Sequence, residues 1–205
     1  MPFQISQVQF HSVKAGNQYL LDSNIWIQIL SPKNVVSYKN KQYNSLFQKI
    51  IKNNEVKIIL PALLISEVLN RLLREVHMNK FARKNGYPNG KDIPGDFFKD
   101  KFRPSPEFKK AYNLLCDDIR NYSDSISLVN DSFGTDINYD DVLLDPPQGL
   151  DFNDYFYCTL AKQNDYIIVT DDKDFWVEDV KIITESNTII ERNKMLTVSN
   201  SISKQ

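Results

Sequence analysis

Apolar residues along the chain form short continuous runs that alternate with helical repeats. Continuous runs are typical of strands that are buried on both faces of a sheet. These runs cover residues 19–21, 56–60, 166–170 and 180–184. Between them, apolar positions recur every three or four residues, as in helices that pack against a sheet. The predicted helices cover residues 25–30, 37–53, 61–78 and 151–163. Strands that alternate with helices predict a three-layer α/β fold, with a central parallel sheet flanked by helices.

The chain of 205 residues fits one domain that contains a large insertion. Glycines and prolines break the alternating pattern after residue 79, a helical repeat follows at 107–122, and a polar, acidic loop is expected from there to Pro146. We therefore predict a single domain over residues 1–205, with an insertion over about 80–149. Residues 190–205 are polar and are expected to form a flexible tail.

Composition excludes several classes of protein. The net charge is −1, so bulk charge predicts no partner. The only cysteines, Cys116 and Cys158, form no CxxC pair, and the two histidines are far apart, so a zinc site is not expected. The N-terminus has no charged head followed by a long apolar run, and no segment approaches the roughly 18 apolar residues of a membrane span. We expect a soluble cytoplasmic protein.

Acidic residues lie where predicted strands end. Asp22 follows directly on the first apolar run, and Thr170, Asp171 and Asp172 close a later one. Ligands of parallel sheets bind at the carboxyl ends of the strands. The fold prediction therefore places these acids on the functional edge of the sheet.

Two further acids lie on the predicted flanking helices. Glu67 is in the helix that follows the second strand, and Asp154 is near the start of a later helix. The residues three, four and seven positions after Asp154 are apolar or amphipathic, so Asp154 is expected on the packed face. Asp151, one turn earlier, lies on the same stripe, and we count it as a supporting residue.

Each acid also has an ordinary structural explanation. Asp22 and Asp151 suit helix N-caps, and Asp154 in a first turn complements the helix dipole. Glu67 has the spacing to form an exposed ion pair with Arg71. The acids that follow Thr170 suit a simple acidic turn.

Taken together, the acids predict a metal site. The candidate catalytic and metal-binding residues are Asp22, Glu67, Asp154 and Asp172. Two unit charges about 5 Å apart repel by roughly 3 kcal/mol at an effective dielectric of about 20. A cluster of carboxylates therefore needs a cation or raised pKa values. Oxygen ligands suit Mg²⁺ or Mn²⁺, which activate water and neutralise a phosphate during in-line hydrolysis.

Four segments carry these acids. They read LLDSNIW, PALLISEVLNRL, DFNDYFYCTLAK and YIIVTDDKDF. In this order they resemble the signature segments of PIN domains, especially those of VapC-type toxin ribonucleases. The resemblance covers about residues 18–78 and 150–185. It departs from typical toxin members in the long stretch between the second and third motifs.

The resemblance implies a PIN fold and a divalent-metal-dependent endoribonuclease, which could serve as a toxin or a defence effector. It implies that Asn24 and Thr170 support the acids and that Asp174 is an additional metal ligand. RNA, a cognate antitoxin and a second copy of the chain are the candidate partners. A non-catalytic PIN-like module that binds RNA or protein, and a DNA nuclease with the same carboxylates, are alternatives. A haloacid-dehalogenase-like phosphatase is disfavoured because it would need a second Asp where this chain has Asn24.

The predicted insertion is polarised in charge. Residues 80–110 hold nine Lys or Arg against four acids, whereas residues 111–150 hold eight Asp and one Arg. Aromatic residues are interleaved with the basic ones, a combination that can follow a nucleic-acid backbone. Lys99, Lys101 and Arg103 are the candidate nucleic-acid contacts. The alternative is a solvated flap whose aromatic side chains pack onto the domain.

Overall fold

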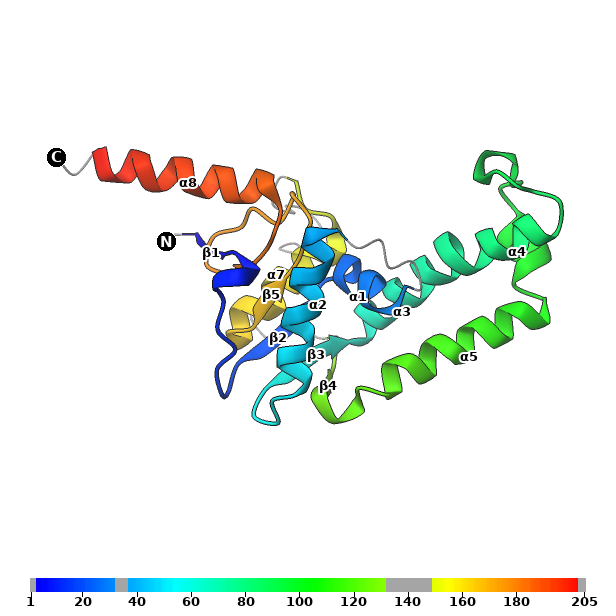
Figure 1. The fold of residues 1–205 in the computed structure, drawn as a ribbon, viewed down its shortest axis with the longest axis horizontal. Helices are drawn as coiled ribbons and strands as arrows, with labels where there is room; N and C mark the ends of the chain where they lie inside the picture. The colour runs from blue at the N-terminus through cyan, green and yellow to red at the C-terminus, as the bar shows by residue number, and fades with distance from the viewer. Residues whose placement is uncertain (1–2, 32–36, 132–148, 203–205) are drawn as a thin grey trace.

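The centre of the molecule is a parallel β-sheet (Figure 1). The computed structural model describes residues 3–31, 37–131 and 149–202, with side chains up to residue 196. Six strands lie in the order β1-β6-β5-β2-β3-β4, and all neighbouring pairs are parallel. The strands are β1 (Gln4–Ser6), β2 (Gln18–Leu21), β3 (Lys57–Pro61), β4 (Ile126–Val129), β5 (Ile167–Val169) and β6 (Lys181–Ile183).

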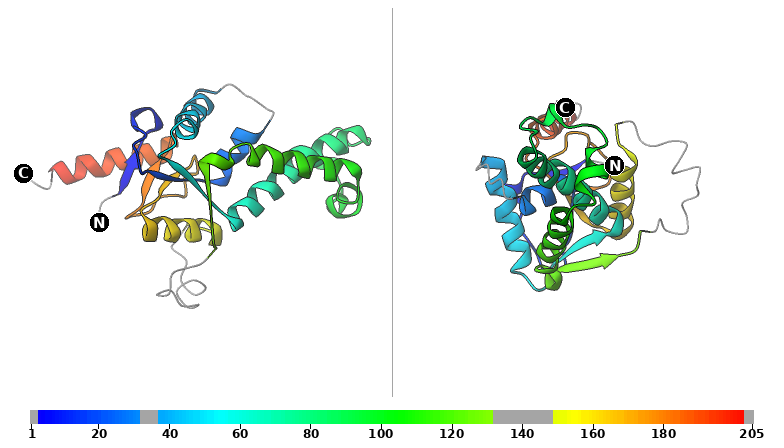
Figure 2. Two further views of the ribbon diagram at one scale, coloured as in Figure 1. Left: turned by 90° about the horizontal axis from the view of Figure 1, so that it is seen from below. Right: turned by 90° about the vertical axis from the view of Figure 1, so that its right-hand side faces the viewer.

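Helices cover both faces of the sheet. The α-helices are α1 (Ser23–Leu30), α2 (Tyr38–Ile51), α3 (Ala62–Arg71), α4 (Asn79–Lys84), α5 (Pro106–Arg120), α7 (Phe152–Asn164) and α8 (Asn187–Ile202). Two π-helical segments are η2 (Leu72–Met78) and η4 (Phe98–Phe102), and short 3-10 turns are η1 (Val8–Phe10), η3 (Gly90–Asp92) and η5 (Ser123–Ser125). Helices α2 and α7 lie on opposite faces (Figure 2). The three-layer α/β fold predicted from the sequence is confirmed.

The inner strands are buried because their side chains meet a helical layer on each face. Leu20, Ile58 and Ile168 are completely buried, one on each of three neighbouring strands. Helices begin at side chains that satisfy free backbone amides. The Ser37 hydroxyl accepts the amide of Asn40 at the start of α2, 3.1 Å away. These local signals match the sequence pattern, so the predicted strands and helices form where expected.

Residues 72–120 form a helical arm that projects from the body (Figure 1). From the end of α3 the chain runs outward along η2 and α4 and returns along α5. The interior of the arm is aromatic: Phe98 and Phe102 are buried, and the rings of Phe102 and Phe108 lie 5.4 Å apart between centroids. The guanidinium of Arg74 lies 4.1 Å from the centroid of the Phe98 ring. The aromatic residues of this segment therefore pack chiefly against one another.

Three parts of the fold differ from the sequence prediction. The acidic stretch after residue 122 was expected to be a loop, but Ile126–Val129 forms the edge strand β4, paired with β3. The tail expected at 190–205 is helical as far as Ile202, within α8. Strand β1 was not predicted. Residues 132–148 of the expected insertion lie outside the described residues. No described helix is both long and apolar enough to cross a membrane.

Candidate active site

The candidate site lies at the carboxyl edge of the sheet, where β2 and β5 end side by side. Asp22 follows β2, and Thr170 follows β5. The backbone amide of Asp22 donates to the Val169 carbonyl at 3.0 Å, which continues the pairing of the two strands by one residue. The parallel sheet thus brings two segments together that are far apart in the sequence, as the strand-end argument predicts.

Asp22 is buried, with 3% of its surface exposed, and its carboxylate is fully engaged. The hydroxyl of Thr170 donates to its Oδ2 at 2.7 Å. The side-chain amide of Asn24 donates to the same oxygen, and the amide of Ser23 donates to Oδ1, so Asp22 also caps α1. The capping explanation and the site explanation are therefore both valid for Asp22. Asn24 and Thr170 hold one orientation of its carboxylate.

Glu67 reaches the site from α3 and is held by α7. Its Oε2 accepts hydrogen bonds from the Tyr157 hydroxyl at 3.0 Å and from the Asn153 side-chain amide at 3.1 Å. The exposed pair with Arg71 that the spacing allowed is not formed in this structure. Arg71 instead donates to the Ser23 hydroxyl at 3.0 Å and pairs with Glu75 at 3.2 Å.

Asp154 lies in the first turn of α7. Its backbone amide donates to the Asp151 carboxylate at 2.9 Å, so Asp151 is the N-cap of this helix. The Asp154 carboxyl has no such role in the helix. It lies near enough to Asp22, Asp151, Asp172 and Glu67 for the charge of each to act on its pKa.

Burial and mutual repulsion raise the pKa values of two carboxyls. Desolvation raises the pKa of Asp22 to about 6, and the charges of Glu67 and Asp172 add to the rise. Desolvation also raises the pKa of Asp154 to about 8, with Asp22 as the strongest of the neighbouring charges. The neighbouring charges that contribute most to these two shifts are all negative. The four acids therefore form one electrostatic cluster.

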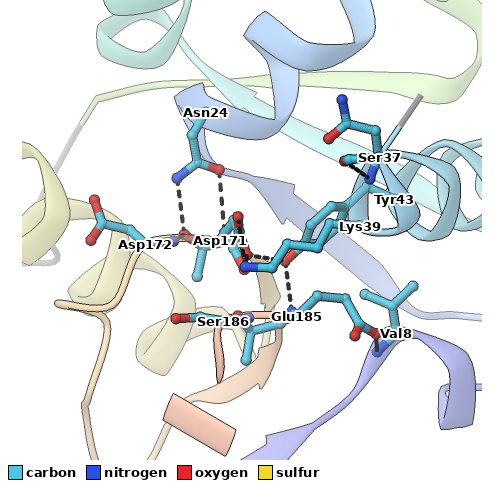
Figure 3. Close-up of polar contacts among 12 residues, drawn as sticks. Val8, Asn24, Ser37, Lys39, Tyr43, Asp171, Asp172, Glu185 and Ser186 are labelled. Carbon is cyan, nitrogen blue, oxygen red and sulfur yellow. Dashed lines mark hydrogen bonds and ion pairs between the residues drawn. The ribbon is translucent and has the colours of Figure 1, made fainter. Parts of the chain in front are cut away.

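The two adjacent aspartates after Thr170 point in different directions (Figure 3). Asp171 pairs with Lys39 at 3.0 Å and accepts the Tyr43 hydroxyl at 3.1 Å, away from the cluster. The amide of Asp172 donates to the Thr170 hydroxyl at 2.9 Å, and the charge of Asp172 acts on Asp22 and Asp154. Asp172, and not Asp171, thus belongs to the cluster.

Asp174 lies further along the same turn. Its backbone amide donates to the Asp172 carboxylate at 3.0 Å, and its own side chain is exposed. It is not among the charges that shift the pKa values of Asp22 and Asp154. A ligand role for Asp174 stays a prediction.

The chemistry of the donors fits a divalent cation. The cluster offers hard oxygen ligands whose charges repel one another, which is the condition that a bound cation relieves. As the side chains stand, no three His, Cys, Asp or Glu residues in the described ranges form a group able to hold one metal ion. The carboxyls would therefore have to turn toward a bound ion.

Sequence reasoning missed the residues that orient the acids. Tyr157 is completely buried, and Asn153 is next to Asp154, yet neither was predicted to contact Glu67. Tyr43 lies in the helix predicted at 37–53, and nothing in the sequence pattern indicated that its hydroxyl lies 3.0 Å from the Thr170 carbonyl. Only the amphipathic character of the tyrosines could have indicated these roles, because a buried tyrosine hydroxyl usually finds a partner.

Comparison with known proteins bears on the fold. No protein-family model matches the chain, and no curated protein matches it. Among solved structures it is similar to VapBC2 from Rickettsia felis, described as bound to a DNA fragment from their promoter: the TM-score is 0.49 and the identity 13%, over 82% of this chain and 98% of that one. It is also similar to PAE2754 from Pyrobaculum aerophilum, with a TM-score of 0.43 and 19% identity over 95% and 99% of the two chains. Both are likenesses of fold alone.

Proposed function

We propose that this protein is a divalent-metal-dependent nuclease of the PIN kind that cleaves RNA internally. The observation that carries the proposal is the cluster of four acids on one sheet edge, two of which have pKa values raised by burial and by the other acids. Mg²⁺ or Mn²⁺ would supply an activated water and neutralise the charge of the phosphate. The residues proposed to hold the ion are Asp22, Glu67, Asp154 and Asp172, with Asp174 as an additional ligand.

The protein's own residues prepare this chemistry. Asn24 and Thr170 orient the carboxylate of Asp22, and Tyr157 orients that of Glu67, so both acids are held at the sheet edge before an ion binds. Burial and the neighbouring acids raise the pKa of Asp154 in the metal-free site. A bound cation would favour its ionised form, in which it would hold the ion or accept a proton from the attacking water.

We extend the proposal to partners from the resemblance of the four sequence motifs. A toxin or defence effector of this kind would act on cellular RNA and would be held inactive by an antitoxin protein. A second copy of the chain is a further proposed partner. DNA cleavage by the same carboxylates is the alternative activity.

The test compares two neighbouring aspartates. Asp172→Asn should reduce the rate of RNA cleavage by about a hundredfold or more, because the proposed metal site loses a charged ligand. Asp171→Asn makes the same chemical change one residue earlier, but Asp171 pairs with Lys39 outside the cluster. This control should keep most of the wild-type rate. Both rates are measured on a labelled RNA and on a DNA of the same sequence.

The metal is tested in the same assay. EDTA should abolish cleavage by the wild-type protein, and excess Mg²⁺ or Mn²⁺ should restore it. Full activity in EDTA, or equal rates for the two aspartate variants, would contradict the proposal. Binding of RNA without any cleavage under these conditions would favour the non-catalytic alternative.

A further inference from the structure

A basic groove runs along one side of the arm, between α4 and α5. Its hollow has a volume of about 430 Å³, and its apolar lining includes Phe81, Phe102 and Leu114. Three lysines line it as well: Lys80 and Lys84 on α4, and Lys110 on α5. The groove thus combines an apolar lining with positive charge from two facing helices.

The positive charge of this groove is largely uncompensated. Lys80, Lys84 and Lys110 are exposed, and within the described parts of the chain no acid lies within ion-pair distance of them. Glu107 is the single acid among the residues that line the hollow. Exposed lysines held in an array without acidic partners are typical of a surface that binds a polyanion.

The basic residues singled out from the sequence have different surroundings. Lys101 lines another hollow together with two acids, Asp96 and Asp100. The guanidinium of Arg103 lies 5.2 Å from the centroid of the Phe98 ring and covers the interior of the arm. The groove gathers three lysines from two facing helices around one hollow with a single acid, which favours it over residues 99–103.

We propose that the groove binds the phosphate backbone of a single-stranded RNA whose cleaved bond lies at the carboxylate cluster. The inference rests on the proposed nuclease function. Glu67 and Lys80 lie on one outward helical run, α3 through α4, and are separated by at most about 20 Å, the length of an α-helix at 1.5 Å per residue. That distance corresponds to roughly six nucleotides of a stacked strand with a rise of 3.4 Å. A short RNA would occupy the cluster alone, whereas a longer one would also reach the groove.

Recognition in this groove should depend on charge and not on base sequence. The rings that could stack on bases are largely taken up by the interior of the arm: Phe102 is 1% exposed and packs against Phe81 with 5.5 Å between ring centroids. Lysine acts as a point charge toward phosphates and carries little sequence information. The groove would therefore select for RNA length.

The test measures binding without cleavage, in the Asp22→Asn background. The groove variant carries Lys80→Gln, Lys84→Gln and Lys110→Gln together. Its matched control carries Lys14→Gln, Lys49→Gln and Lys52→Gln, which remove the same charge from exposed positions that precede β2 and β3, at the opposite edge of the sheet. A third variant with arginine at the three groove positions keeps the charge. The probes are fluorescent oligouridines of about 5 and 20 nucleotides.

The groove variant should bind the long probe more weakly, and the slope of log affinity against log salt should become shallower by about 2, as expected for three lost phosphate contacts on a single strand. The control and the arginine variant should match the parent, and binding of the short probe should not change. Equal losses of RNA affinity in the groove variant and the control would overturn the proposal. So would equal losses of affinity for the long and the short probe, or a loss of affinity caused by replacing Lys99, Lys101 and Arg103 and not by the groove variant.

Three further outcomes separate the possible failures. Unchanged binding of both RNAs with lost binding of a polyglutamate probe would overturn the proposal in favour of an acidic protein partner. If the chain with intact Asp22 does not cleave either probe in Mg²⁺, the nuclease proposal fails, while a length-dependent effect of the groove variant still supports an RNA surface. If cleavage is intact and the groove variant binds normally, the groove proposal alone fails.

Discussion

Replacing Asp22 by asparagine should change how the stability of the metal-free protein depends on pH. Burial raises the pKa of Asp22 from 3.8 to about 6, so the folded state holds this proton more tightly than the unfolded chain. Its stabilising contribution is fully present below pH 3.8 and is lost as the pH rises through 6. One pKa unit corresponds to about 1.4 kcal/mol, so the wild-type protein should lose about 3 kcal/mol from this group between pH 3.8 and about 7.

Asparagine has no charge to bury, so the variant should not show this loss. The altered hydrogen bonds to Asn24 and Thr170 cost free energy, but this cost is the same at every pH. The free energy of unfolding of Asp22→Asn relative to wild type should therefore rise by about 3 kcal/mol between pH 3.8 and about 7. The difference between the two proteins isolates Asp22 from the other titrating groups, apart from the coupled pKa of Asp154, which should fall once the Asp22 charge is gone.

The assay is urea unfolding in EDTA at several pH values from 4 to 8. Asp117→Asn, which removes an exposed acid paired with Arg120, is the control and should give a difference that is flat within about 0.5 kcal/mol. A flat difference for Asp22→Asn would refute the reasoning, because it would mean that the buried carboxyl titrates normally. Excess Mg²⁺ should flatten the curve of the wild-type protein, since a bound cation favours the ionised carboxylate.

Two further predictions concern residues that support the site and the arm. Tyr157→Phe removes the 3.0 Å hydrogen bond to Glu67 and should raise the Mg²⁺ concentration for half-maximal cleavage by about tenfold; an unchanged metal requirement would contradict this positioning role. Phe102→Ala empties the interior of the arm and should cost about 3–5 kcal/mol in urea unfolding, whereas a loss below about 1 kcal/mol would show that the aromatic cluster adds little to stability.

The sequence predicted the inner strands and the placement of the acids on one edge because both depend on local patterns. A continuous apolar run such as residues 56–60 forms a strand wherever both faces are covered, and Asp22 follows such a run directly. The outer strands carry a weaker pattern. Strand β4 has no fully buried residue, and β1 has three residues of which one is exposed, so neither resembles a buried run.

The partners of side chains could not be predicted from spacing along one helix. The position of Arg71 one turn after Glu67 favoured an ion pair, but the fold brings Tyr157 and Asn153 from α7 against Glu67 instead. The packing of the arm could not be predicted either. Its composition shows aromatic residues among basic ones, but it does not show that the rings turn inward. Contacts of this kind depend on how elements pack, which the pattern within each element does not contain.

The order in which the chain is made also matters for the candidate site. The Asp22 carboxylate accepts a hydrogen bond from the hydroxyl of Thr170, which lies 148 positions later in the chain. Strand β1 likewise pairs with β6, near the other end of the chain. A ribosome adds roughly 5–20 residues per second, so on the order of ten seconds pass between the synthesis of Asp22 and the synthesis of β5, the strand that pairs with β2. A growing chain can thus hold three of the four acids without the strand that fixes the first of them. Because the site needs β2 and β5 side by side, it can form only after β5 has been synthesised. A chain stopped before that strand would lack the geometry proposed for cleavage.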